Sequence, residues 1–423
     1  MYTLSTLRRA SCLLFLACAA LFIAPPKAAA QAGQLDPTFG QGGIVTTDFG
    51  LGFVNDLAAA FAVAIQPDGK IVVCGSSPTA IGAPLATLAR YNTNGSLDTS
   101  FGTNGIVTTS NVALPSAIVL QTNGDIVVAG SIVFRGSSET MNVLRYSASG
   151  ILDSTFGTGG IVTLSNDQGA ASSALALQPN GDILYANGSV LFRLLPNGQL
   201  DASFGSGGKT ALAGKGVVAL GLFSNGKILV AGTLSGSGTI GRYSSNGALD
   251  ATYGINGQLG TTGSANEMLL LANGQLLVAG NLASGVLGPT LGFAVTQYVA
   301  AGVTNPKFGT HGGVVTPVPG SPTVQTTGLG VELSGDIVTL GTGSANFANY
   351  VFALARYTST GQLDNTFGTD GIVTTAFAGK STVTSYGLAI QSDGKIVAVG
   401  SYSVQEGVNS TDYGFLLARY LGQ

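Results

Sequence analysis

The sequence has 423 residues, 64 of them glycine, and only 9% of its residues are charged. The sequence has 17 basic and 20 acidic residues. The basic residues form no cluster along the chain, so nucleic acid is not an expected partner. Low charge combined with abundant valine, isoleucine, leucine and threonine indicates a folded all-β chain and excludes a disordered one.

Residues 1–30 have the pattern of a secretory signal peptide. Arg8 and Arg9 precede an apolar run at 12–24 that is too short for an ordinary membrane span, and Ala28-Ala29-Ala30 supplies a cleavage site. We therefore expect residues 31–423 to be exported to the periplasm, the cell surface or the exterior. Cys74 would be their one cysteine, which excludes an intramolecular disulfide, and we expect a monomer without a membrane span.

The region after residue 30 repeats one pattern at steps of 48–62 residues, the spacing of a propeller or a solenoid. In the first unit a hairpin at 61–75 turns at Asp68-Gly69, a third strand covers 86–91, and a fourth covers 105–109. The Asp-Gly turn is a strong hairpin signal, because glycine tolerates a positive φ. Its glycine recurs as Gly124, Gly181, Gly226, Gly274, Gly335 and Gly394. Seven such units predict one all-β domain at 31–423, a seven-bladed β-propeller of four-stranded antiparallel blades.

An arginine column and an aspartate column run through the repeats at a constant offset of eight residues. They are expected to form structural ion pairs, because the one unit that lacks the arginine, at Gln297, also lacks the aspartate, at Asn305. Replacing both partners of a buried pair can be nearly neutral, whereas losing one costs roughly 3–5 kcal/mol. The alternative is two independent surface charges. The expected pairs are Arg90 with Asp98, Arg145 with Asp153, Arg193 with Asp201, Arg242 with Asp250, and Arg356 with Asp364.

The two ends of the repeat region are complementary. Asp36 has no arginine eight residues before it, and Arg419 has no aspartate after it. A lone fourth strand at 44–47 opens the region, and three strands that lack a fourth close it. We therefore predict that the N-terminal strand completes the last blade, that Arg419 pairs with Asp36, and that the ring is closed. The alternative, an open solenoid, needs distinct capping repeats, and the sequence contains none.

Two aromatic columns are expected to be core between blades. One aromatic residue per unit at fixed spacing is what packing requires, and a cofactor-stacking role is not favoured. The first column contains Phe39, Phe101, Phe156, Phe204, Tyr253, Phe308 and Phe367. The second contains Tyr91, Tyr146, Tyr243, Tyr298, Tyr357 and Tyr420, with Leu194 in the remaining unit.

The repeat motifs resemble a known family. Leu-Asp-x-x-Phe-Gly, Gly43-Ile44-Val45-Thr46-Thr47, Gln66-Pro67-Asp68-Gly69-Lys70 and Leu88-Ala89-Arg90-Tyr91 are similar to the delta-60 repeat family of exported bacterial proteins. The resemblance covers residues 33–423 and is weakest between about 260 and 341. It implies a propeller-like repeat protein without an established activity, and it supplies no catalytic residue.

Motifs for catalysis, metals and cofactors are not found in the sequence. His311 is the single histidine, in the most degenerate unit, and is interpreted as a loop residue. The chain has no zinc-ligand spacing, no tryptophan for stacking a quinone, and no phosphate loop. The Asp-Gly positions lack the spaced carboxylates of a calcium loop. No catalytic residue, metal or cofactor is therefore expected.

The variable loops are expected on one face of the ring. Loops between the second and third strands, and links between blades, emerge together on this long-loop face. The regular turns emerge on the opposite, short-turn face, which is expected to be polar with little apolar area. Variable loops of repeat proteins often form the binding face. The candidate ligand-binding residues there are Phe49, Phe53, Asp56, Phe134, Arg135, Glu139, Phe347, Tyr350, Tyr402, Asp412 and Tyr413. The alternative for each aromatic is local core.

These features favour an exported binding or scaffold module that recognises a glycan, a peptide or a protein. A propeller hydrolase or lyase acting on extracellular polysaccharide is the alternative, with a carboxylate acid/base pair. No spacing selects the pair from Asp56, Glu139, Asp167, Glu406 and Asp412. A purely structural surface protein is the third interpretation.

Overall fold

The computed structural model describes residues 31–49, 58–79, 84–110, 112, 114–132, 139–166, 173–234, 237–261, 263–283, 290–345, 348–405 and 411–422. All of these residues belong to one compact unit, Gln31–Gln423. The expected signal peptide lies outside the described residues.

Within that unit the chain forms a seven-bladed β-propeller. The described residues contain strands and turns but no helix, and each blade is a four-stranded antiparallel sheet. Blades 1 to 4 are β2(Ala59–Ile65) β3(Ile71–Ser77) β4(Leu85–Tyr91) β5(Ile106–Thr109); β6(Leu114–Leu120) β7(Ile126–Ile132) β8(Glu139–Tyr146) β9(Ile161–Asn166); β10(Ser173–Leu177) β11(Ile183–Asn187) β12(Val190–Leu194) β13(Lys209–Ala211); and β14(Lys215–Leu222) β15(Ile228–Leu234) β16(Ser237–Tyr243) β17(Gln258–Gly260). Blades 5 and 6 are β18(Glu267–Leu270) β19(Leu276–Ala283) β20(Thr290–Tyr298) β21(Gly313–Thr316) and β22(Thr323–Val331) β23(Ile337–Ala345) β24(Ala348–Tyr357) β25(Ile372–Ala376), so the degenerate fifth and sixth units are complete blades.

The seventh blade contains both ends of the unit. It combines β26(Thr382–Ile390), β27(Ile396–Gln405) and β28(Thr411–Tyr420) with the N-terminal strand β1(Ile44–Asp48). β1 pairs with β28 from Ile44 opposite Ala418 to Asp48 opposite Gly414. The predicted closure of the ring by the N-terminal strand is therefore confirmed.

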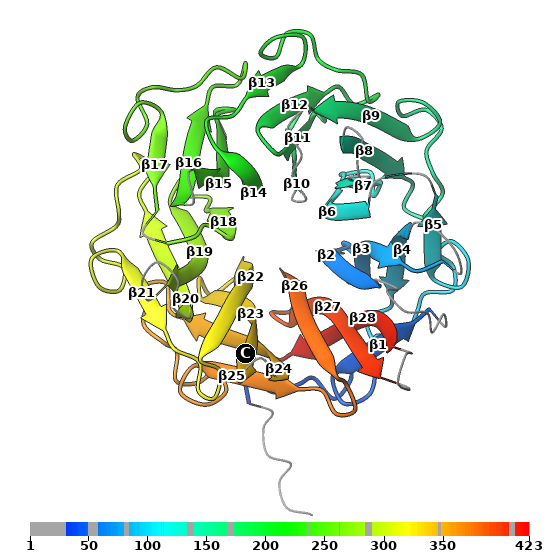
Figure 1. Cartoon of the computed structure of the whole chain (residues 1–423), viewed down its shortest axis with the longest axis vertical. Helices are drawn as coiled ribbons and strands as arrows, with labels where there is room; N and C mark the ends of the chain where they lie inside the picture. The colour runs from blue at the N-terminus through cyan, green and yellow to red at the C-terminus, as the bar shows by residue number, and fades with distance from the viewer. Residues whose placement is uncertain are drawn as a thin grey trace, which may run out of the picture. The chain divides into compact units, whose positions relative to one another are not determined.

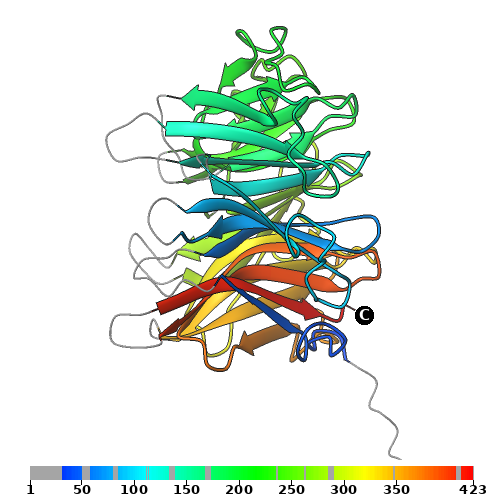
Figure 2. The same cartoon turned by 90° about the vertical axis from the view of Figure 1, so that its right-hand side faces the viewer.

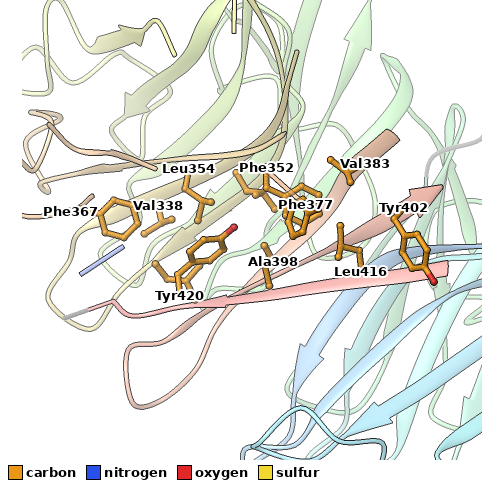
Figure 3. Close-up of a cluster of buried hydrophobic side chains, with 13 residues drawn as sticks. Val338, Phe352, Leu354, Phe367, Phe377, Val383, Ala398, Tyr402, Leu416 and Tyr420 are labelled. Carbon is orange, nitrogen blue, oxygen red and sulfur yellow. The ribbon is translucent and has the colours of Figure 1, made fainter. Parts of the chain in front are cut away.

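The blades surround a central axis, with the first strand of each blade innermost (Figure 1). Seen from the side, the strands run between the two faces of the ring (Figure 2). Separate apolar clusters lie between neighbouring blades. One of them joins blades 6 and 7 through side chains such as Phe352, Leu354, Leu416 and Tyr420 (Figure 3). Stability therefore comes from burial between successive sheets, as the absence of a disulfide among the described residues requires.

Both aromatic columns are buried between blades, as predicted. Phe39, Phe101 and Phe156 are 0% exposed, and so are Tyr91 and Tyr146. The hydroxyls of Tyr91, Tyr146 and Tyr420 also reach a threonine of the neighbouring blade. The hydroxyl pairs Thr47–Tyr91 and Thr109–Tyr146 are each 2.7 Å apart. This explains the threonine that ends Gly-Ile-Val-Thr-Thr, because a buried hydroxyl needs a partner.

Candidate functional site

The arginine and aspartate columns form ion pairs on the short-turn face. The shortest nitrogen–oxygen distances are 2.8 Å for Arg90–Asp98, 2.7 Å for Arg145–Asp153, 2.6 Å for Arg193–Asp201, 2.9 Å for Arg242–Asp250, 2.7 Å for Arg356–Asp364 and 2.9 Å for Arg419–Asp36. Each guanidinium carbon also lies 4.5–4.7 Å from the centroid of an aromatic ring of the same unit. These rings belong to the first aromatic column, the Phe column, which begins with Phe39. A cation stacked on an aromatic face adds to the ion pair.

Each of these arginines also joins its blade to the next one. Arg145 donates to the backbone oxygen of Pro196 at 2.5 Å, and Arg193 donates to that of Ser245 at 2.6 Å. Arg419 donates to the backbone oxygen of Thr93, which connects the last blade to the first. The arginine therefore has a structural role, and its donors are used within the protein.

The aspartates are held in their charged form. Burial alone would raise the pKa of Asp98, but hydrogen bonds from Ser100 and Lys70 and the charge of Arg90 together hold it well below its usual range. A hydrogen bond from the Thr155 side chain is the largest influence on Asp153 and lowers its pKa. A carboxylate stabilised in this way is a poor acid or base at neutral pH.

The degenerate fifth unit replaces the ion pair with a neutral hydrogen bond. Asn305 donates from Nδ2 to Oε1 of Gln297 at 2.6 Å. Gln297 is 4% exposed, so this hydrogen bond gives its buried side-chain oxygen a partner within the protein.

His311 stands in the same unit, in a turn with a φ of 55°. Gly42 and Gly159 stand at the corresponding turn positions of other units with φ of 61°. The position of His311 is therefore set by a turn that requires left-handed backbone.

The short-turn face is more apolar than expected. Ile255 is 82% exposed and Leu333 is 89% exposed, and both belong to the turns on this face. Of the exposed large apolar side chains among the described residues, all but Val315 lie in these turns: Ile151, Leu200, Leu249, Ile255, Val303 and Leu333. The expectation of little apolar area was wrong, because it considered only the glycine, asparagine and aspartate of the turns and not the residues beside them.

Five of the eleven candidate long-loop residues lie outside the described part of the chain. Phe53, Asp56, Phe134, Arg135 and Phe347 lie outside the described residues, and so do Asp167 and Glu406 of the alternative acid/base set. Glu139 begins β8 and pairs in register with Asn166 at the end of β9.

Three of the placed aromatics pack against the core. Tyr402 is 4% exposed and belongs to the cluster between blades 6 and 7 (Figure 3). The Lys380 nitrogen lies 3.7 Å from the centroid of the Tyr402 ring. Tyr350 is partly buried against the same cluster. Phe49 packs edge to face on Phe415, with ring centroids 4.9 Å apart. These placements correspond to the local-core alternative.

Asp412 and Tyr413 lie on an extension of the last blade. β27 and β28 remain paired beyond Tyr402 and Gly414, up to Gln405 opposite Thr411. In blade 1 the corresponding pairing ends at Ser77 opposite Leu85, at the level of Tyr402. The β27–β28 hairpin therefore extends farther on the long-loop face than the hairpin of blade 1, and it carries a partly exposed carboxylate and a partly exposed aromatic ring.

A cavity of about 260 Å³ lies at the centre of the ring. It is lined by the innermost strands of all seven blades, and Glu267 is its one acidic residue among those described. Glu267 is partly exposed to the cavity, and no hydrogen-bond or ion-pair partner is found for it among the described residues. Removal from bulk water raises the pKa of Glu267 to about 8.

Sequence reasoning missed Glu267, although the sequence contains a signal for it. Counting seven residues back from each turn glycine gives one column: Ala62, Ala117, Ala174, Ala219, Glu267, Gly328 and Gly387. Every other unit has alanine or glycine in this column, so close packing does not explain a glutamate there. The signal emerges only when the hairpins are aligned on their turns.

Neither a metal site nor a membrane helix is found in the described part of the chain. No group of three His, Cys, Asp or Glu side chains there could hold a metal ion. No helix there is long and apolar enough to cross a membrane.

Five segments match the model of a family described as a domain of unknown function (DUF5122) beta-propeller: residues 66–101, 121–156, 224–253, 334–367 and 391–420. Each segment begins at or near a hairpin turn and ends at the Phe or Tyr column. These matches support a β-propeller family. No curated protein matches the sequence.

Similar solved structures share little sequence with this chain. A protein from Lactobacillus plantarum is 12% identical over 82% of this chain and 98% of its own, with a TM-score of 0.49. A protein of unknown function from Dyadobacter fermentans is 10% identical over 89% and 99%, with a TM-score of 0.45. An ulvan lyase of polysaccharide lyase family PL25 is 13% identical over 87% and 95%, with a TM-score of 0.42. None of the three decides between binding and catalysis for this chain.

Proposed function

We propose that this chain is an exported binding or scaffold protein of the cell envelope or the cell exterior. It recognises a glycan, a peptide or a protein through its long-loop face. The signal-peptide pattern of residues 1–30 supports export, and the motifs shared with the delta-60 repeat family of exported bacterial proteins support the same location.

The observation that carries this proposal is that the charged side chains of the repeat lie on the short-turn face and are paired there. Arginine and aspartate of the repeat motif are bound to each other and to neighbouring backbone on the short-turn face. Some turn lysines join them: Lys70 lies 3.0 Å from Asp98, and Lys227 lies 2.8 Å from Asp250. These groups build the ring and leave recognition to the variable loops on the other face.

The β27–β28 extension supports recognition on the long-loop face. A partly exposed aromatic ring beside a carboxylate, as at Tyr413 and Asp412, is a common combination on recognition surfaces.

The test compares matched double variants on the two faces. Binding is measured to the strongest hit from an array of glycans and peptides. Asp412→Asn with Tyr413→Ser, on the long-loop face, is expected to weaken binding at least tenfold, or about 1.4 kcal/mol. Asp336→Asn with Leu333→Ser makes the same kinds of change on the short-turn face and is expected to leave the affinity unchanged.

Both variants should keep the melting temperature of the parent, because all four side chains lie at least partly exposed. The reverse result, with affinity lost only in the Leu333 variant, would place recognition on the short-turn face and contradict the proposal.

A further inference from the structure

The central cavity has the features of a built site. Its wall combines the rings of Phe61 and Tyr386, the hydroxyls of Ser116 and Thr327, and the carboxyl of Glu267. The two rings come from blades 1 and 7 and pack edge to face, with centroids 5.1 Å apart. The volume of about 260 Å³ is enough for a small organic molecule, since a cavity of roughly 150 Å³ can bind benzene.

Glu267 stands where the other blades have no side chain larger than a methyl group. It pairs in register with Ala279 on β19, as Ala117 pairs with Ala129 and Ala174 with Ala186. Close packing explains the glycine at 328, because a Cβ there would lie 2.7 Å from Leu388 Cβ. No comparable contact explains a glutamate.

Two polar groups of this wall lack a partner within the protein. The Ser116 hydroxyl is buried and has no hydrogen-bond partner among the described residues. Among the described residues, Glu267 has neither a cationic side chain nor a hydrogen-bond donor beside it. Thr327, in contrast, shares a hydrogen bond of 2.7 Å with Ser385. A carboxylate removed from bulk water is costly unless a positive charge accompanies it.

We propose that the central cavity is a second binding site, for a small organic ammonium compound, with the Glu267 carboxylate as its counter-charge. The ammonium group supplies the missing partner of Glu267, and the unpartnered hydroxyl of Ser116 lines the same cavity. Aromatic faces attract cations, so Phe61 and Tyr386 favour an organic cation over a neutral molecule. Calcium is disfavoured, because it requires six to eight oxygen ligands and the wall offers one carboxylate.

Binding is expected to release a proton. With its pKa raised to about 8, the carboxyl of Glu267 is mostly protonated at pH 7 in the free protein. An ammonium ion favours the carboxylate and lowers that pKa, so the affinity rises from pH 6 to pH 9.

The strands packed against β18 contain one titratable residue. β14, β19 and β22 pack against β18. β19 and β22 contain no titratable residue, and Lys215 at the start of β14 is the only one on that strand. Tyr386 is the other titratable residue of the described wall.

Calorimetric titration of the purified exported chain with butylammonium tests the proposal. Tetramethylammonium, butanol, K⁺ and Ca²⁺ are titrated in parallel. We expect a millimolar or tighter Kd for an ammonium probe, which is about −4 kcal/mol or better, and at least tenfold weaker binding of butanol. Two buffers of different ionisation enthalpy should report the released proton at pH 7.

Glu267→Gln and Glu267→Ala are expected to weaken ammonium binding at least tenfold and to abolish the proton release. The alanine variant is the folding control, because four other blades have alanine in this column. Equal affinity of the alanine variant, equal binding of butanol, preference for an inorganic cation, or no ammonium binding at any pH from 6 to 9 would each overturn the proposal.

Discussion

Deleting residues 31–48 is expected to destabilise the ring by more than about 5 kcal/mol. The deletion removes β1, the Asp36 partner of Arg419 and the fully buried Phe39. Loss of one buried aromatic ring costs about 3–5 kcal/mol, and loss of one partner of a buried ion pair costs a similar amount. Thermal melting of the truncated protein should show a midpoint at least about 6 °C lower, because an unfolding entropy of about 2.1 cal/mol/K per residue makes 1 kcal/mol equal to roughly 1.2 °C in a chain of this size.

The truncation also exposes the edge of β28, and an exposed strand edge promotes association. A peptide of residues 31–48 added in trans should therefore restore part of the lost stability. Thr46→Ala is the control, because Thr46 is an exposed residue of the same strand. An unchanged melting midpoint with a monomeric truncated protein would contradict closure through β1.

Asp98→Asn is expected to destabilise the protein by about 3–5 kcal/mol. The change leaves the guanidinium of Arg90 buried, with the 2.8 Å ion pair to Asp98 lost. The double variant Arg90→Gln with Asp98→Asn should be less destabilised than this single variant, because it copies the hydrogen-bonded pair of Gln297 and Asn305. Chemical denaturation of the parent, both single variants and the double variant completes the thermodynamic cycle.

A coupling free energy of about 0.5–3 kcal/mol is typical of two residues in contact, and the value here should lie at or above the upper part of that range. Asp125, in a hairpin turn of the same short-turn face, is partly exposed, and Asp125→Asn should change stability by less than about 0.5 kcal/mol. Additive effects of the two single variants would show that Arg90 and Asp98 act independently.

Much of the ring could be predicted because repetition inside one chain provides its own comparison. The joint change at Gln297 and Asn305 indicated a side-chain contact without any homologue, and the unpaired Asp36 and Arg419 indicated where the ring closes. Strand positions followed from the turn glycines, since an Asp-Gly or Asn-Gly turn determines the register of the hairpin. The role of Arg90 in joining blades was missed, because its acceptor, the Ala148 backbone oxygen, carries no sequence signal.

The candidate site was harder to predict, because composition does not say which way a side chain points. Tyr402 and Tyr413 are separated by a loop in the sequence and look equivalent there. The structure places Tyr402 in the core, whereas Tyr413 is partly exposed. Glu267 was overlooked for a different reason. The repeat pattern accounted for its strand as the first strand of a hairpin, and the individual side chains of that strand were not compared between units.

The most direct test of the account asks whether the exported chain binds or cleaves. The purified protein is incubated with the strongest glycan hit of the array and with polymers of the same sugar, and both the retained and the released material are analysed by mass spectrometry. A binding function predicts that the glycan or polymer is retained at its original mass. Time-dependent appearance of shorter fragments with the parent protein, and not with a heat-inactivated control, would contradict the binding function and support the hydrolase or lyase alternative.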